Sequence, residues 1–309
     1  LDAMWSDDFH HALHVLLTGE RHHYYVDFEG VASLATAYWD GFVYTGQPSA
    51  YRRRRHGNAS ADVLSSRFVV CAMNHDQVGN RRLGDRLAPR IGFERLKLAA
   101  GATILSPFLP LLFMGEEYGE TAPFPYFVSH GDAKLLAAVR EGREREYRSI
   151  GKGGKVPDPA AEATFASARL DRGLLAREPN RRLREFYREA LRLRRTLPLL
   201  TWEMRDDVVT ETAADGPSGG NAAGRVLVVR RAVGNAGTCL LLHFDDAPAP
   251  VRLHLPAGYW RLALDSAAPA WGGPGSRLPA TVDSREEVAL ELPGPCVALL
   301  VREPAQDTT

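Results

Sequence analysis

The sequence predicts an α/β domain with parallel strands over residues 1–200, followed by a small antiparallel β-sandwich over residues 201–309. The first domain is predicted by two unbroken apolar runs, Phe68–Met73 and Leu109–Met114, which are typical of strands buried on both faces. Residues 93–105 between them have helical character, which gives the alternation of strand and helix found in parallel sheets. The second domain is predicted by a change of composition, after which short β-type runs alternate with Gly- and Pro-rich turns.

Composition limits the partners of the chain. Lys plus Arg and Asp plus Glu both number 38, so the net charge gives no reason to expect nucleic acid or an anionic membrane. No apolar run approaches the roughly 20 residues of a membrane span, and the amino end has no signal-peptide pattern. Cys71, Cys239 and Cys296 have neither disulfide nor metal spacing. We therefore expect a cytoplasmic protein without a metal, a cofactor, a nucleic-acid partner or a membrane partner.

The chain opens on Leu1–Trp5, which is typical of the tail of a strand, and we expect it to begin inside a domain. Asp7 or Asp8 is predicted to cap a helix, and Gly19 is predicted to close that helix in a left-handed conformation. The helix itself is predicted by an amphipathic stripe of Phe9, Ala12, Leu13, Leu16 and Leu17.

Several side chains near the amino end allow more than one interpretation. His10 and His14 are one turn apart, but no carboxylate or cysteine stands at ligand spacing, so packing, capping or sugar contact is favoured over a metal site. The run Arg52–Arg55 is favoured as a solvated face or a donor to hydroxyl groups over a nucleic-acid site. The aromatic residues nearby either stack on sugar rings or cover the sheet: His22, His23, Tyr24, Tyr25, Phe42 and Tyr44.

After the second apolar run, residues 134–148 are predicted to form a charged helix and residues 151–160 a loop. Asn180 is predicted to cap an amphipathic helix that Pro198 ends. A Gly-, Ala- and Ser-rich segment at 213–224 lies within the second domain. The strands predicted for that domain are 225–233, 238–244, 251–255, 259–265, 287–292 and 296–301.

Polar residues follow both apolar runs, where the carboxyl ends of adjacent parallel strands would meet. Asp76 follows the first run, and Glu116, Glu117 and Glu120 follow the second. Paired carboxylates beside amides and aromatic rings suit glycoside chemistry, which passes through an oxocarbenium-like transition state. Phosphoryl transfer is disfavoured because no Gly-rich phosphate cradle is present, and acyl transfer because no Gly-x-Ser-x-Gly elbow is present.

The triplet Asn74-His75-Asp76 after a buried strand resembles the fourth conserved motif of the alpha-amylase superfamily. Longer segments resemble the malto-oligosyltrehalose trehalohydrolase family of that superfamily, and the resemblance runs over residues 1–200. These segments are Trp5–Ala12, Leu17–Arg21, Asn74–Arg81, Phe113–Glu120 and Val139–Arg143. The predicted sandwich matches the family's C-terminal domain only by type and place.

The resemblance implies a fold and an activity. It implies that the first domain is the C-terminal part of a (β/α)8 barrel, followed by the β-sandwich. It implies hydrolysis of the α-1,4-glucosidic bond next to the terminal trehalose of maltooligosyltrehalose, which releases trehalose with retention of configuration. Such an enzyme serves trehalose biosynthesis, and its partner is maltooligosyltrehalose or a related α-1,4-glucan.

The resemblance also implies roles for single residues. Asp76 resembles the family's third carboxylate, which stabilises the transition state, and His75 resembles an imidazole that hydrogen-bonds the same sugar. Glu117 takes a supporting role, in place of the acid role that its position alone suggests. The implied substrate contacts are Tyr24, Tyr51 and Arg52 on the trehalose side of the cleft, and Asn74, His75, Gln77 and Glu117 elsewhere.

The family's nucleophilic Asp and acid/base Glu belong to barrel strands that would lie before Leu1. Strands are found for only about three of the eight in such a barrel. We therefore expect this chain alone to be inactive, and its partner to be the N-terminal part of the same enzyme. Two alternatives stay open: a glucan branching enzyme of the same superfamily, and a non-catalytic maltooligosaccharide-binding fragment.

Overall fold

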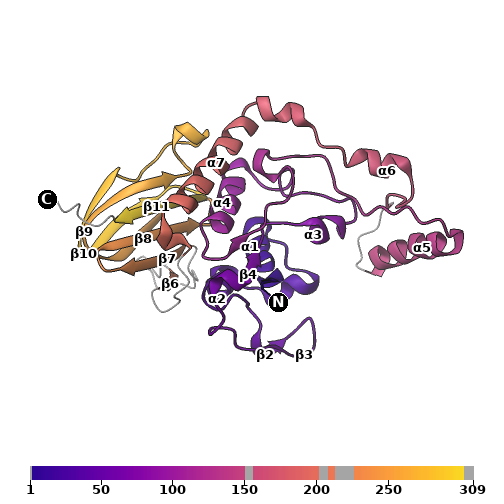
Figure 1. The fold of residues 1–309 in the computed structure, drawn as a ribbon, viewed down its shortest axis with the longest axis horizontal. Coiled ribbons are helices and arrows are strands. Elements are labelled where there is room, and N and C mark those ends of the chain that lie inside the picture. Colours follow the sequence, from indigo (N-terminus) through magenta and orange to yellow (C-terminus); the bar gives the residue numbers. More distant parts are fainter. Residues whose placement is uncertain (1, 150–155, 202–207, 213–225, 303–309) are drawn as a thin grey trace.

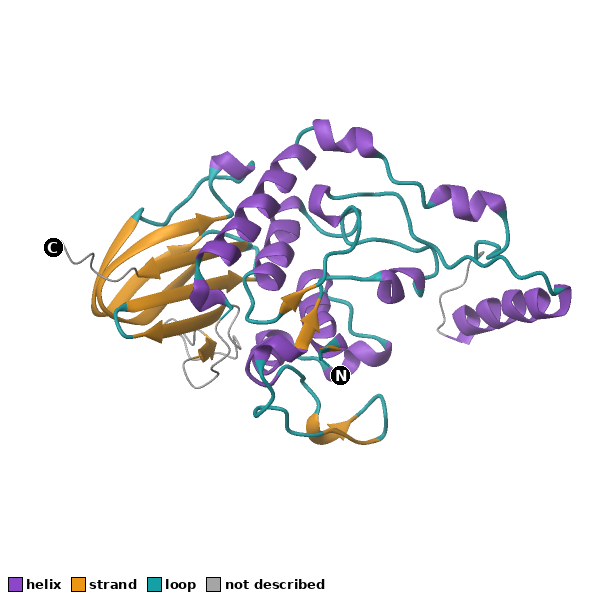
Figure 2. Cartoon of the chain, viewed as in Figure 1, coloured by secondary structure: helices purple, strands orange, loops and turns teal. Residues whose placement is uncertain are grey.

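The computed structural model describes residues 2–149, 156–201, 208–212 and 226–302. Two main sheets organise them, a three-stranded parallel sheet and a six-stranded antiparallel sheet. Figure 1 shows the antiparallel sheet at one end of the molecule, the parallel strands near its centre, and a helical arm at the other end. Helix α4 (Phe93–Ile104) contacts strands of both sheets, and α7 (Asn180–Thr196) packs against α4 (Figure 2).

The parallel sheet has the order β1 (Met4–Trp5), β4 (Phe68–Val70) and β5 (Leu109–Pro110). Both predicted strands are therefore neighbours in a parallel sheet, and the opening of the chain forms a third strand beside them. The second apolar run is less buried than predicted, because β5 is short and lies at an edge of the described sheet. Its exposed side chains are Leu109, Leu112 and Met114, at 42%, 36% and 50%.

Helix α1 (Asp7–Thr18) forms as predicted, but its amino-terminal cap is Ser6 rather than either of the two aspartates that follow it. Ser6 Oγ accepts a hydrogen bond from the backbone N–H three residues later, at 3.4 Å. Asp8 instead turns inward, and its carboxylate accepts hydrogen bonds from the backbone N–H groups of residues 43–44. Gly19 closes the helix at φ +72°, as predicted.

Further helices and one hairpin complete the first domain. They are η1 (His23–Asp27), α2 (Gly30–Asp40), β2 (Thr45–Ser49), β3 (Arg54–Gly57), η2 (Ser65–Arg67), α3 (His75–Gly79), η3 (Glu116–Tyr118), α5 (Ala133–Ser149), α6 (Glu162–Ser167), η4 (Arg172–Ala176) and η5 (Pro198–Leu200). Helix α5 confirms the predicted charged helix, whereas part of the predicted loop at 151–160 lies outside the described residues.

Helix α7 ends before Pro198, as predicted, but Asn180 does not cap it. Pro179 occupies the cap position, and Asn180 Nδ2 donates to the backbone carbonyl of Tyr118 at 2.6 Å. The asparagine therefore ties α7 to the segment after β5, instead of satisfying the helix's own N–H groups.

The antiparallel sheet has the order β10, β9, β11, β8, β7, β6. Its strands are β6 (Val208–Thr212), β7 (Val226–Val233), β8 (Ala236–His243), β9 (Ala249–Asp265), β10 (Thr281–Leu292) and β11 (Cys296–Arg302). The strands predicted at 251–255 and 259–265 form the single strand β9, because β10 pairs along most of its length. Strand β6 was not predicted, and the segment 213–224 lies outside the described residues.

The sheet has an apolar core on each face. Leu227 and Val229 belong to the core shared with the helices, and Val226 and Val228 belong to a second core that includes Trp260. This alternation is the period-2 pattern of a strand. Both faces of β7 are buried, as in the inner strands of a sandwich, although the described strands form one continuous hydrogen-bonded sheet.

The antiparallel sheet is tied closely to α4. Lys97 is fully buried, and its ammonium group donates to the backbone carbonyls of Ser266 at 2.6 Å and Trp271 at 3.3 Å. The same group pairs with Glu94 at 2.9 Å. At Gly101, an added Cβ would lie 2.7 Å from the Val297 side chain, so a glycine is needed where helix and sheet approach.

In the described part of the chain, no helix is long and apolar enough to cross a membrane. Cys71, Cys239 and Cys296 are buried, and none of them forms a disulfide. The domain boundary near residue 200 and the cytoplasmic location stay predictions.

Candidate active site

The segment after β4 presents His75 and Asp76 to the outside. The strand is followed by the short helix α3, where the sequence suggests a loop. Buried Asn74 caps that helix: its Oδ1 accepts hydrogen bonds from the backbone N–H groups of Asp76 at 2.8 Å and Gln77 at 3.3 Å. The asparagine amide is thus engaged in positioning α3, while the His75 and Asp76 side chains are 56% and 58% exposed.

His75 and Asp76 lie beside an aromatic ring at the end of the neighbouring strand. His75 Nε2 is 3.5 Å from Asp76 Oδ1, and the His75 ring meets Trp5 edge-on with centroids 5.8 Å apart. Gln77 Nε2 donates to Asp7 Oδ1 at 3.1 Å, which joins α3 to the first turn of α1. The residues that follow the carboxyl ends of β1 and β4 are therefore in contact with one another, and we call them the strand-end surface.

Tyr24 and Tyr51 belong to a cluster of rings beside this surface. The Tyr24 ring lies 4.7 Å from the ring of His11 and 6.1 Å from that of Tyr51. Asp27 shapes the turn that carries Tyr51, accepting hydrogen bonds from Ser49 Oγ at 2.5 Å and from the backbone N–H of residue 50 at 2.7 Å. Burial raises the pKa of Asp27, but its hydrogen bonds outweigh that effect and hold the pKa below its ordinary value.

A hollow of about 470 Å³ joins the two groups of predicted residues. Its lining includes Trp5 and Asp7 on one side, Arg52 and Tyr44 on the other, and His11 between them. The Arg52 guanidinium is 5.7 Å from the centre of the Tyr44 ring. Of the predicted substrate contacts, Arg52 lines this hollow. The side chains of His75, Gln77 and Tyr24 contact Trp5, Asp7 and His11, which also line it.

The carboxylates after β5 behave differently from the sequence prediction. Buried Glu116 accepts a hydrogen bond from the backbone N–H of Phe113 at 3.1 Å, and burial raises its pKa to about 8. Buried Glu120 accepts from the Tyr118 hydroxyl at 3.0 Å and from the backbone N–H of Asp171 at 2.7 Å. These two groups are occupied in holding the loop, which corrects their assignment to a paired catalytic set; Glu117 is partly exposed.

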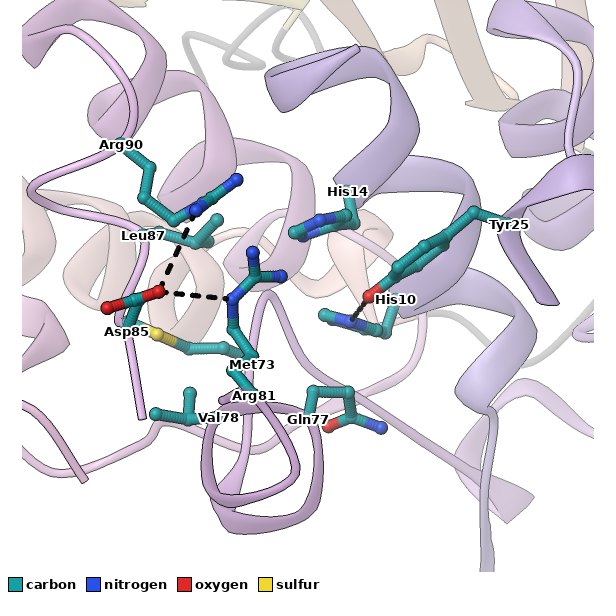
Figure 3. A pocket seen from close by; sticks show the side chains of 10 residues that line it. All are labelled: His10, His14, Tyr25, Met73, Gln77, Val78, Arg81, Asp85, Leu87 and Arg90. Atoms are coloured by element: carbon teal, nitrogen blue, oxygen red, sulfur yellow. Dashed lines mark hydrogen bonds and ion pairs between the residues drawn. The ribbon is translucent and has the colours of Figure 1, made fainter. Parts of the chain in front are cut away.

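The structure also reveals a partly buried charged network centred on Glu20, to which the sequence assigned no function; Figure 3 shows the His14, Arg81 and Arg90 side chains that belong to it. Glu20 Oε2 accepts from His14 Nε2 at 2.8 Å, and both carboxylate oxygens accept from Arg81, at 2.9 Å and 3.0 Å. Arg90 donates to Glu20 at 2.5 Å. The partners are up to 70 residues apart, so no local pattern could have found them.

The histidines of α1 are packing groups in this structure. His10 Nδ1 lies 2.8 Å from the backbone carbonyl of Ala72, and His14 stacks on Tyr25 at 4.6 Å with an interplanar angle of 16°. Burial lowers the pKa of His14, and the Glu20 hydrogen bond does not reverse that effect. In the part of the chain that the structure describes, no group of three or more His, Cys, Asp or Glu side chains could hold a metal ion.

Comparison with known proteins identifies relatives of this chain. A family described as a domain of unknown function (DUF3459) matches residues 219–282. A malto-oligosyltrehalose trehalohydrolase from Rhizobium sp. (strain M-11) is 42% identical over 257 residues, which is 80% of this chain and 43% of that protein. The enzyme of the same name from Saccharolobus solfataricus is 44% identical over 195 residues, 63% of this chain and 33% of that protein.

A solved structure supports the same placement. The crystal structure of a putative alpha amylase from Salmonella typhimurium is 33% identical, with a TM-score of 0.78, over 97% of this chain and 47% of that one. The chain thus spans less than half the length of the relatives it matches. The antiparallel domain and the parallel strands are consistent with part of a barrel followed by a β-domain. The chain is a homologue of the malto-oligosyltrehalose trehalohydrolases, within the alpha-amylase superfamily, and it corresponds to their C-terminal half.

Proposed function

We propose that the chain forms the C-terminal part of a retaining glycoside hydrolase that cleaves the α-1,4 bond next to the terminal trehalose of maltooligosyltrehalose. The observation that carries this proposal is the placement of Asp76. It is exposed at the carboxyl end of the central parallel strand, on a helix that Asn74 holds in place, beside the hollow between Trp5 and Arg52. Barrel enzymes build their active sites at this end of the strands.

In this proposal Asp76 stabilises positive charge that develops on the sugar at the cleavage point. The Asp76 carboxylate lies at the exposed amino end of α3, where a ligand can reach it. The Asn74 side chain binds only the backbone N–H of Asp76 and leaves the carboxylate accessible. His75 donates to a hydroxyl group of the same sugar, and Gln77 fixes the surface between α3 and α1. Glu117 supports the loop after β5.

Tyr24, Tyr51 and Arg52 form the trehalose side of the site in this proposal. Aromatic rings provide apolar faces for sugar rings, and a guanidinium donates several hydrogen bonds to hydroxyl groups. Arg52 is exposed and lines the hollow, and Tyr51 is 43% exposed, so both are accessible to a ligand.

The nucleophile and the acid/base are proposed to come from the remaining length of the enzyme. The parallel sheet leaves apolar side chains exposed on both outer strands, among them Met4 at 48%, Trp5 at 44% and Leu109 at 42%. Exposed apolar strand edges of this kind favour a covering partner. We propose that the N-terminal part of the same enzyme covers them and supplies the two missing carboxylates.

The test joins this chain to the N-terminal part of a homologous trehalohydrolase and compares it with its Asp76→Asn variant. Trehalose release from maltotriosyltrehalose is expected to fall by about 10²–10³ in the variant, because the charge is lost and the shape is kept. Near-normal release by the variant would refute the role of Asp76. Branched glucan formed from amylose, without trehalose, would favour a branching enzyme, and binding without turnover would favour a non-catalytic protein.

A further inference from the structure

Glu20 lies at the centre of a partly buried charged network near the proposed site. Its side chain is 13% exposed, and it accepts hydrogen bonds from His14, Arg81 and Arg90. Burial raises the pKa of Glu20, but the hydrogen bonds from His14 and Arg81 and the charges of Arg81 and Arg90 hold it well below its usual range. Glu20 is therefore negatively charged, and its partners are the guanidinium groups of Arg81 and Arg90 and the ring N–H of His14.

One arm of this network leads to Asp76. Arg81 makes a bidentate pair with Glu20, at 2.9 Å and 3.0 Å, and directly follows Asn80, the carboxyl-terminal cap of α3. The backbone N–H of Asn80 donates to the carbonyl of Asp76 at 2.9 Å. A bidentate arginine–carboxylate pair fixes orientation as well as distance, so Glu20 holds this end of the short helix on the α1 side, while Arg143 and Tyr147 bind the same end from α5.

The other arm leads to the aromatic wall of the site. His14 Nε2 donates to Glu20, and the His14 ring stacks on Tyr25 at 4.6 Å. The Tyr25 ring lies 4.6 Å from that of Tyr24, which in turn contacts Tyr51. Figure 3 shows His14, Tyr25 and Arg81 gathered around one small cavity.

We infer that Glu20 is a positioning residue that fixes the distance between Asp76 and the rings of Tyr24 and Tyr51. It thereby controls how well the sugar units fit on either side of the cleaved bond. The inference rests on the proposed function for the identity of the ligand. A second link between α3 and α1, from Gln77 to Asp7, is exposed and is a single hydrogen bond, so it holds the helix less firmly.

The test uses the 309-residue chain with Glu20→Gln, which keeps the shape and removes the charge. The control is Glu189→Gln, because Glu189 also makes a bidentate pair with an arginine, Arg192, on the exposed side of α7. NMR signals are compared for the Asp76 amide and the Tyr24 ring, together with the affinity for maltotriosyltrehalose. A residue that only adds stability would leave these signals at their wild-type positions well below the unfolding temperature.

In Glu20→Gln we expect both sets of signals to shift and the affinity to fall about 10-fold, as misplaced binding groups lose productive contacts. Glu189→Gln should change neither. Wild-type signals at both sites in folded Glu20→Gln would overturn the inference. A wild-type chain that does not bind the sugar would count against the proposed function in this chain, while the signals still decide the role of Glu20.

A second variant covers the case in which Glu20→Gln does not fold. Arg81→Lys keeps the positive charge but cannot make two parallel hydrogen bonds to Glu20. We expect this variant to shift the NMR signal of the Asp76 amide directly. It should also shift the signals of the Tyr24 ring, through Glu20 and His14. A shift confined to α3, with the Tyr24 ring unchanged, would overturn the inference.

Discussion

Arg194 on α7 offers a direct measure of how the helices hold the parallel sheet. Its guanidinium donates to three backbone carbonyls, those of Ile104 at 2.8 Å, Ser106 at 2.5 Å and Phe108 at 2.5 Å. All three acceptor residues are fully buried. Burial lowers the pKa of Arg194 to about 10, so the side chain stays charged at neutral pH. It therefore closes the carboxyl-terminal end of α4 and the connection into β5.

Arg194→Met keeps most of the side-chain volume and removes all three donors. Each buried carbonyl that loses its partner costs about 1–3 kcal/mol. A carbonyl oxygen has a second lone pair that can keep another contact, so we use the lower end of that range. We expect the free energy of unfolding to fall by about 3–5 kcal/mol. The measurement is urea unfolding followed by circular dichroism at neutral pH.

The matched control is Arg192→Met on the same helix. Arg192 pairs with Glu189 at 2.6 Å, but its side chain is 51% exposed. An exposed pair of this kind contributes about 0–1 kcal/mol, so the control should change stability little. Equal losses in the two variants, or a loss under about 1 kcal/mol for Arg194→Met, would refute the argument from buried carbonyls.

Three further outcomes are expected. The folded-state pKa of Glu116 is raised to about 8 from 4.5, so the unfolded chain loses this proton at a lower pH than the folded chain. The contribution of Glu116 to stability is therefore complete below pH 4.5 and is lost as the pH rises through about 8. Glu116→Gln should flatten that decline when stability is measured by urea unfolding at several pH values. Arg52→Ala in the joined enzyme should lower the preference for trehalose-capped over plain maltooligosaccharide by about 1–3 kcal/mol, read from the ratio of kcat/KM values. The 309-residue chain alone should release no trehalose from maltotriosyltrehalose; turnover by a monomer would show that its own carboxylates suffice.

The sequence predicted those helices and strands whose pattern of apolar residues lies within one short segment. The stripe of α1 and the apolar run of β4 are local patterns, and both elements form. Their caps were harder, because Ser6 and the two aspartates after it are all good capping residues, and only the fold shows that Asp8 turns inward to residues 43–44.

The candidate site was predicted less completely than the fold. Asp76 follows β4 in the chain, so its place at the strand end could be inferred from position alone. The orientations of Glu116 and Glu120 could not, because their hydrogen-bond partners include Tyr187 and Asp171, which lie more than 50 residues away. The partners of Glu20 were hidden for the same reason.

The buried Lys97 has a consequence for how the molecule unfolds. Its ammonium group satisfies carbonyls of the antiparallel domain from within a helix of the first domain, and Gly101 one turn later meets Val297 at close range. If the chain were cut near residue 200, the Lys97 ammonium group would face solvent. The apolar side chains of α4 that pack against the antiparallel sheet would also be exposed. The two domains are therefore expected to melt together in a single cooperative transition, and neither should survive as an independent folding unit.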